Sequence, residues 1–274
     1  MSVYRYINAL SLDVVAGALV STLFFAHLFN TKLPVEILIA LGLAVWSVYT
    51  IDHLWDARRS NQSTGSFRHQ LHRRHFKLLT VIASAALLAG GVMTGYLPAA
   101  TRLVGLFLIL TVMVYFLTVH LYHSRASYHK EILVALIYTC GIIAGPYSMA
   151  QGHFSFNILL VAIQFAALAY SNLLLFSYYE HEMDRQQNFS SLARSIGERN
   201  IKLLIRWILM AILLSAVVGL ILFNKNKVVV ESQWVIILMT IPLGTLLWYR
   251  EYFKQQDRYR LLGDAIFLIP LFWL

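Results

Sequence analysis

The chain has little cysteine and little charge, and both scarcities narrow its class. Cys140 is the only cysteine among 274 residues, which excludes an internal disulfide and a metal centre built from several cysteines. Asp, Glu, Lys and Arg make up only 13% of the residues, whereas they make up about 25% of a soluble domain. Hydrophobic residues make up 59%, and the few charges avoid long apolar runs. The composition therefore predicts an integral membrane protein.

The apolar runs are about 18 to 23 residues long, which is the length of a helix that crosses a bilayer. An open sheet is excluded at such depth, because lipid offers no partner for its edges. We expect nine transmembrane helices, over residues 7–28, 34–56, 76–96, 102–120, 131–150, 154–179, 201–223, 234–249 and 261–274. The last run is short for a full crossing. The predicted fold is one all-α bundle, a single domain over residues 1–274, around a central lipid-accessible cavity.

The basic residues are distributed unevenly between the loops of such a bundle. The loops on one side hold only Lys32, Arg102, Lys225 and Lys227, and the loops after the even-numbered helices hold most of the others. The positive-inside rule places the N-terminus and the basic loops in the cytoplasm, and we expect a bacterial inner membrane. Topology and anionic lipid then account for the net charge of +9, so we expect no nucleic-acid partner.

Two short acidic stretches end apolar runs on this cytoplasmic side. The first holds Asp52 and Asp56, the second holds Glu180 and Asp184, and arginine follows each. Within each pair the carboxylates are four residues apart, so on a helix they lie on one face. The two stretches form a weak internal repeat. This repeat suggests two half-bundles that face each other and bring the four carboxylates together.

Four carboxylates at one membrane edge predict a magnesium site, because Mg²⁺ prefers hard oxygen ligands together with water and substrate phosphates. Such ions would bridge a diphosphate, and nearby cations would neutralise its remaining charge. The candidates for diphosphate binding are Arg58, Arg59, Lys130, Arg185 and Arg194. An attached isoprenoid chain would lie between the helices, while metal and cations stabilise the departing group. The plainer alternative for either stretch alone is an interfacial ion pair.

A prenyl cation released in this way needs a dry pocket with electron-rich walls. We expect Tyr49, Asn172 and Tyr178 to line the pocket for the prenyl group and the acceptor. Tyrosines near a membrane interface are more often belt residues, and Asn172 has the alternative role of joining two helices.

Other polar residues permit two interpretations each. Asn8 and Asp13 near the first helix either cap it or line a polar cavity. His69, His72 and His75 have a spacing that suits a metal, but cysteine and acidic residues do not accompany them. We therefore expect these histidines to be solvated or to face lipid headgroups.

Two pairs of glycines have the four-residue spacing that permits close helix contact. They are Gly91 with Gly95 and Gly141 with Gly145. We expect each pair to face a neighbouring helix at short range.

Over nearly its whole length the sequence resembles the UbiA superfamily of intramembrane prenyltransferases. Asp52 with Asp56 stands where that family has its first aspartate-rich motif, and Glu180 with Asp184 stands where it has its second. Residues 130–145 and 184–197 are also similar to the family's stretch entering helix five and to the tail of its second motif. The resemblance implies that the four acids bind Mg²⁺ and are catalytic. It also implies magnesium-dependent transfer of a prenyl group from an isoprenyl diphosphate to a lipophilic acceptor, aromatic or other.

The sequence departs from the family pattern at the leading positions of both motifs. Val48 and Tyr49 stand where the first motif usually begins with Asn and Asp, and Ser177 stands where the second often has a leading Asp. These departures keep open a non-catalytic relative that binds isoprenoid lipid. A small-molecule transporter is disfavoured, because the charged residues cluster at the membrane edge rather than at the midplane.

Overall fold

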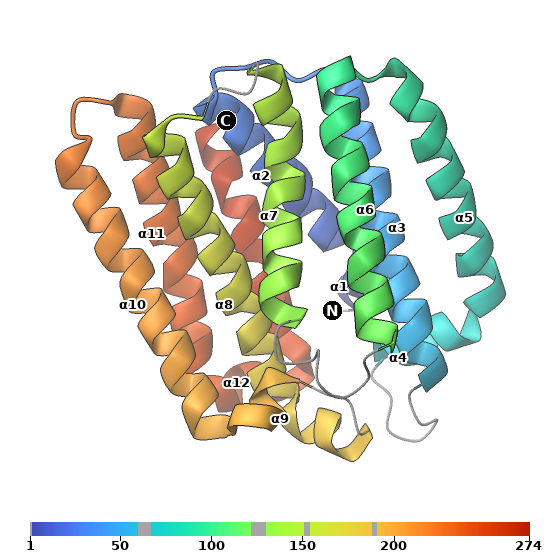
Figure 1. Cartoon of the computed structure of the whole chain (residues 1–274). Helices are drawn as coiled ribbons and strands as arrows, with labels where there is room; N and C mark the ends of the chain where they lie inside the picture. Colours follow the sequence, from blue (N-terminus) through green and yellow to red (C-terminus); the bar gives the residue numbers. More distant parts are fainter. Residues whose placement is uncertain (1, 60–66, 122–129, 151–153, 188–190) are drawn as a thin grey trace.

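The structure is a computed structural model that describes residues 2–59, 67–121, 130–150, 154–187 and 191–274, and its regular elements there are helices (Figure 1). The long helices are α2 (Leu12–Leu28), α3 (Val35–Arg59), α5 (Phe76–Met93), α6 (Ala99–Leu121), α7 (Lys130–Met149), α8 (Phe156–Gln187), α10 (Glu198–Leu222) and α11 (Lys227–Trp248). The short ones are α1 (Ser2–Ala9), α4 (Phe67–Arg74), η1 (Thr94–Tyr96), α9 (Leu192–Ile196), α12 (Arg250–Lys254), η3 (Gln255–Asp257), α13 (Arg258–Ala265) and η4 (Ile266–Trp273).

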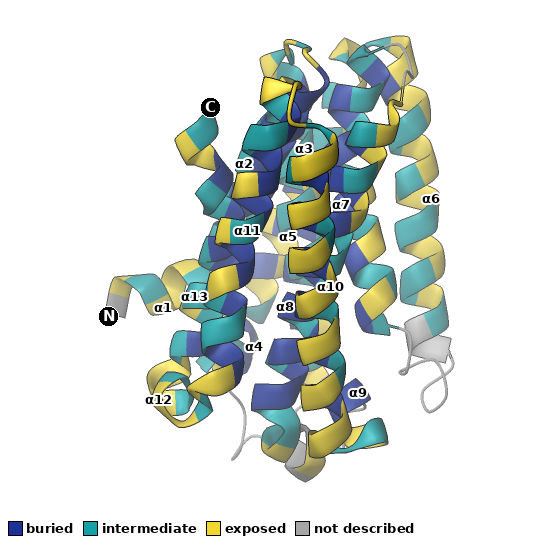
Figure 2. Cartoon of the chain, turned by 90° about the vertical axis from the view of Figure 1, so that its left-hand side faces the viewer, coloured by how far each residue is buried: buried dark blue, intermediate teal, exposed yellow. Residues whose placement is uncertain are grey.

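Within the described residues, seven helices are long and apolar enough to cross a membrane, and the bent pair α1–α2 makes up to eight. The bundle's outward faces are largely exposed and apolar, as Figure 2 shows along α10, whereas the buried residues lie between the helices. Lipid would cover such faces. The chain is therefore an all-α, multi-pass membrane protein, as the sequence predicts. The central cavity stays a prediction.

The first predicted helix, 7–28, is broken. It consists of α1 and α2, which meet at an angle of 69° across Ser11, whose φ is 55°. The break frees backbone carbonyls that need partners. The indole Nε1 of Trp46 on α3 donates to the Leu10 carbonyl at 3.1 Å, so tertiary contact satisfies one of them. As a result α1 turns aside from the bundle axis and packs against α4.

The last predicted run, 261–274, is helical but is not among the described helices that are long and apolar enough to cross a membrane. Its first part belongs to α13 and its second part is the 3₁₀ helix η4, each eight residues long. A 3₁₀ helix rises about 2.0 Å per residue against 1.5 Å for an α-helix, so the two elements extend about 28 Å. This length approaches the thickness of a bilayer core, about 30 Å. The segment packs against α2 and α11.

The glycine prediction holds at one position. A Cβ at Gly145 of α7 would lie 2.7 Å from Cγ2 of Ile37 on α3, so these helices approach closely there. At Gly91, Gly95 and Gly141 a Cβ would meet no atom within 4 Å, so the predicted close contacts at those three positions are wrong.

Candidate functional site

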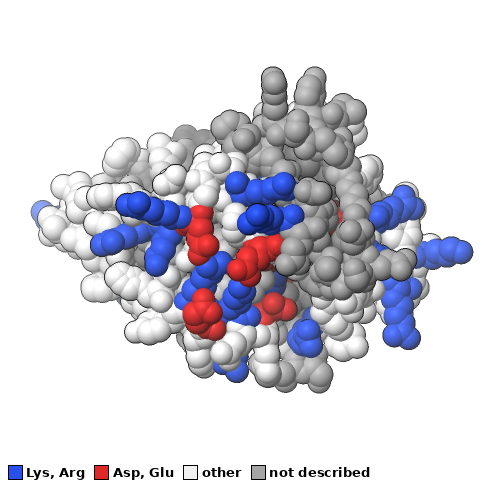
Figure 3. All heavy atoms as spheres, turned by 90° about the horizontal axis from the view of Figure 1, so that it is seen from below, with Lys and Arg blue, Asp and Glu red and all other residues white. Residues whose placement is uncertain are grey.

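Both acidic stretches lie on helices that end at the same face of the bundle (Figure 1). Asp52 and Asp56 lie in the last two turns of α3, and both are half-buried. Glu180 and Asp184 lie near the end of α8, which continues eight residues beyond its predicted end at 179. The side chain of Asp184 is outside the described part of the structure. Figure 3 shows that basic and acidic side chains gather on this face, as the loop charges predict.

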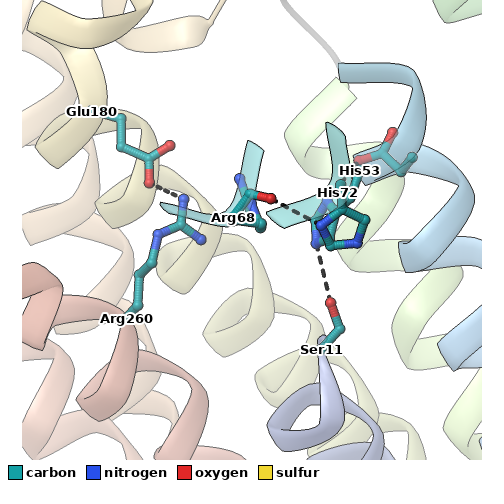
Figure 4. A network of polar contacts seen from close by, with 7 residues as sticks. Ser11, His53, Arg68, His72, Glu180 and Arg260 are labelled. Atoms are coloured by element: carbon teal, nitrogen blue, oxygen red, sulfur yellow. Dashed lines mark hydrogen bonds and ion pairs between the residues drawn. The ribbon is translucent and has the colours of Figure 1, made fainter. Parts of the chain in front are cut away.

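Arg68 on α4 links the two stretches electrostatically (Figure 4). Burial lowers the pKa of its guanidinium most, and the charge of Arg260 lowers it further, whereas Glu180, Asp56 and Asp52 raise it. One half-buried cation therefore interacts with acids from both α3 and α8. In the sequence Arg68 is one of several loop arginines. No local sequence pattern indicates that α4 packs against α3, so its position could not be predicted.

Glu180 is occupied by residues from the C-terminal helix α13. Arg260 forms an ion pair with its carboxylate, and the Tyr259 hydroxyl donates to its Oε1 at 2.9 Å. Tyr259 also stacks on Tyr179, with ring centroids 4.4 Å apart, and the Tyr179 hydroxyl donates to the Leu246 carbonyl at 2.7 Å. The ion-pair alternative thus describes Glu180 in this structure, although its partner is Arg260 rather than the arginine that follows it in sequence.

Three histidines near the first acidic stretch, His53, His69 and His72, are buried rather than solvated. The Nε2 of His53 lies 3.1 Å from the Oγ of Ser11. The ring of His53 also packs against that of His72, with ring centroids 5.3 Å apart. The Nδ1 of His72 donates to the Arg68 carbonyl at 2.9 Å. His69 and His72 are buried, so our expectation that they are solvated or face headgroups is wrong for both, while His75 is exposed.

The charge state of the α4 histidines follows from this burial. Burial, and next the charge of Arg68, lower the pKa of His69 to about 4. Burial likewise lowers the pKa of His72. Both rings are therefore neutral at neutral pH and add no charge beside Arg68. Among the described residues, no group of three or more His, Cys, Asp or Glu side chains is placed to hold a metal.

The predicted diphosphate-binding residues are spread over the face. Lys130, the first residue of α7, is close enough to interact electrostatically with Asp52. Arg58 instead lies over the ring of Phe76, 4.2 Å from its centroid. Arg185 and Arg194 are exposed, and the side chain of Arg59 is not described. Of this set the structure brings Lys130 to the first acidic pair.

The predicted pocket residues take different positions. Tyr49 is half-buried and lies against His53, with ring centroids 6.1 Å apart, directly beside the first acidic pair. Asn172 is buried with an unpaired Oδ1. Tyr178 is buried under Arg250, whose guanidinium carbon lies 4.2 Å from the ring centroid. Tyr49 is therefore the predicted pocket residue that the structure places next to the acids.

One residue of α7 and one of α8 hold the short helix α9 in place. Glu131 of α7 accepts a hydrogen bond from the Leu192 backbone N–H at 3.2 Å, and Ser177 of α8 accepts one from the Ala193 N–H at 3.2 Å. Both acceptors are buried. Ser177, one of the departures from the family pattern, thus satisfies a helix N-terminus that has no cap of its own.

Asn8 and Asp13 belong to a polar cluster with α13. The Nδ2 of Asn8 donates to Asp13 at 2.7 Å and to Asp264 at 3.0 Å. Asn8 therefore does not cap the first helix. Instead it anchors α13 one turn beyond Arg260, which fixes the partner of Glu180.

Gly263 allows α13 to lie against α8, and we predict that Gly263→Ala destabilises the fold. A Cβ there would lie 2.5 Å from Oδ1 of Asn172 and 2.6 Å from Cε1 of Phe176. We expect a loss of about 1–3 kcal/mol of unfolding free energy, measured by denaturant titration in detergent. Gly91→Ala is the control, because its Cβ meets open space and alanine favours a helix. Equal stability of the two variants would contradict the close packing.

The arrangement defines a class: a multi-pass helical bundle whose membrane edge carries paired carboxylates beside half-buried arginine and lysine. A model of the UbiA prenyltransferase family matches residues 14–272. The chain therefore belongs to the UbiA prenyltransferase family. Comparison with curated proteins gives no match.

Solved structures show the same fold. A UbiA homologue from Archaeoglobus fulgidus bound to GPP and Mg²⁺ has a TM-score of 0.66 at 12% identity, covering 97% of this chain and 98% of that one. A UbiA homologue from Archaeoglobus fulgidus bound to DMAPP and Mg²⁺ has a TM-score of 0.64 at 12% identity, covering 97% of both chains. An apo UbiA homologue from Aeropyrum pernix K1 has a TM-score of 0.63 at 12% identity, covering 95% of this chain and 96% of that one.

Proposed function

We propose that the protein is a magnesium-dependent prenyltransferase, which moves a prenyl group from an isoprenyl diphosphate to a lipophilic acceptor within the membrane. The observation that carries the proposal is the half-buried pair Asp52 and Asp56, which interacts with Arg68 and Lys130 at the membrane edge. Family membership and the Mg²⁺-bound homologues support it.

The first acidic pair suits magnesium. Its two carboxylates lie one helical turn apart on one face of α3, and both remain partly accessible. Mg²⁺ is usually held by one or two carboxylates together with water and substrate phosphates. A bound ion would supply charge neutralisation at the leaving diphosphate. Glu180 fits less well, because Arg260 already neutralises its charge and, together with Tyr259, contacts its Oε1.

The protein's own groups bind and orient the rest of the donor. Arg68 and Lys130 offer N–H donors to phosphate oxygens, and arginine is well suited to pairs of them. Tyr49 presents an aromatic ring beside the acids, where a developing prenyl cation is stabilised by a π-face. The apolar interior of the bundle takes the prenyl chain and excludes water from it. We propose a single domain over residues 1–274.

We also propose that this site faces the cytoplasm, in a bacterial inner membrane. The described basic side chains gather at the face where both acidic stretches end, and basic loops stay on the cytoplasmic side. Water-soluble isoprenyl diphosphate would reach the site from that side.

Donor binding tests the proposal. We expect purified protein in detergent to gain several degrees of thermal stability with GPP or DMAPP only when Mg²⁺ is present, because a ligand that binds only the folded state stabilises it. Chelation of the metal should remove the gain. Absence of a shift with either donor would contradict a donor site.

A non-catalytic lipid-binding relative is the second candidate. Val48 and Tyr49 favour it, as does Ser177, which has a structural partner in α9. Diphosphate release in the presence of a lipophilic acceptor separates the two. Release that depends on acceptor supports the transferase, and donor binding without release for any acceptor in a broad screen supports the relative.

A further inference from the structure

We propose that Arg260 replaces a metal ion at the second acidic stretch, so that the donor diphosphate is held by magnesium on Asp52 and Asp56 and by the guanidinium groups of Arg68 and Arg260. This inference rests on the proposed function, and it deepens it by assigning a donor site with one metal.

The first step is the state of Glu180. Its side chain and that of Arg260 are only 15% and 13% exposed, and the two form a direct ion pair. The Tyr259 hydroxyl donates to the same carboxylate oxygen at 2.9 Å. Both contacts are to Oε1, so a metal at Glu180 would have to bind Oε2, and its divalent charge would then lie close to the cations Arg68 and Arg260. The geometry therefore favours arginine as the permanent partner of Glu180.

The second step is that α13 is fixed in place. Asn8 binds Asp264, and Gly263 lets α13 lie against Asn172 and Phe176 of α8. The Tyr259 ring stacks on Tyr179. These contacts are made by residues before and after Arg260 in α13, so they fix the backbone from which Arg260 reaches Glu180.

The third step is that Arg68 has unused hydrogen-bonding capacity. Its Nε is buried and has no hydrogen-bond partner in the described structure. Its charge interacts with Asp52 and Asp56 on one side and with Glu180 on the other. An anion placed between the acidic pair's metal and Arg260 would supply the missing acceptor, and a diphosphate has oxygens on both phosphates to meet both arginines.

Counting bound metal tests the proposal. Mn²⁺ replaces Mg²⁺ and is measured by electron paramagnetic resonance, with geranyl S-thiolodiphosphate as an unreactive donor analogue. We expect about one tightly bound Mn²⁺ per wild-type chain in the complex of protein, Mn²⁺ and analogue, because the first acidic pair and the substrate oxygens together hold one ion. Glu180→Gln should keep this ion, whereas Asp52→Asn should lose it. Two ions per wild-type chain, with one lost in Glu180→Gln, would overturn the proposal.

The arginine is tested through analogue affinity. Arg260→Gln should weaken binding of the analogue at least about tenfold while about one Mn²⁺ per chain remains at saturating analogue, and Arg260→Lys should recover part of the affinity because it keeps the charge. Each variant is first compared with wild type by its unfolding profile. Unchanged affinity in well-folded Arg260→Gln would also overturn the proposal.

A different outcome would contradict the proposed function itself. If the wild-type protein does not bind the analogue with Mn²⁺ at all, the proposed function fails, and this result is distinct from the two that overturn the role of Arg260.

Discussion

Asp52→Asn is expected to abolish magnesium-dependent donor binding and prenyl transfer. The change keeps the shape of the side chain but removes the charge of a proposed metal ligand in the first acidic pair. Mutating groups that merely orient metal ligands costs about 10–100-fold, so loss of a ligand should cost about 100-fold or more in turnover. Turnover is measured with labelled GPP and an acceptor found by screening, and donor binding is measured by thermal shift.

Glu182→Gln is the matched control for Asp52→Asn. Glu182 also lies in an acidic stretch, but its side chain is 68% exposed and binds Lys254 at the surface. We expect its turnover to stay within about twofold of wild type, because exposed ion pairs contribute little. If Asp52→Asn kept wild-type turnover, or if both variants lost it equally, the assignment of the first acidic pair to the metal would be wrong.

The sequence predicts well those features that depend on long patterns. Apolar length and charge distribution place Asp52 and Glu180 at one face of a helical bundle, and the structure brings both within the influence of Arg68. Each acidic stretch is helical, as the four-residue spacing requires. These features could be predicted because membrane thickness and side-chain periodicity act on any sequence in the same way.

The features that sequence patterns miss depend on contacts between distant segments. Arg260 lies 80 residues from Glu180, and no local pattern links them. The break at Ser11 has no Pro or Gly beside it, and it is satisfied by Trp46 from the next helix. In the sequence His69 and His72 lie in a polar segment that is typical of a loop. They are buried because α4 packs against α3 and α1, which no local pattern predicts. In each case packing overrides the local preference.

Arg260→Met should destabilise the protein strongly, because it removes one partner of a buried ion pair. Glu180 would keep the Tyr259 hydroxyl and its electrostatic interaction with Arg68 but lose its direct ion-pair partner, and breaking a buried pair in this way costs about 3–5 kcal/mol. The free energy of unfolding is measured by denaturant titration in mixed micelles. The loss should shrink as the pH falls, because a protonated Glu180 no longer carries a buried charge.

The double variant Arg260→Met with Glu180→Gln separates the pair from its surroundings. Neutralising both partners removes the unpaired charge, so the double variant should be clearly more stable than Arg260→Met alone. Lys254→Met, which breaks the exposed pair with Glu182, should cost about 1 kcal/mol or less. If Arg260→Met cost no more than Lys254→Met, the Glu180–Arg260 pair would not be the buried contact that holds α13 against α8. Arg260 would then be free to leave Glu180, and a metal ion could take its place there. The same variants therefore link the stability of the fold to the choice between arginine and metal at the second acidic stretch.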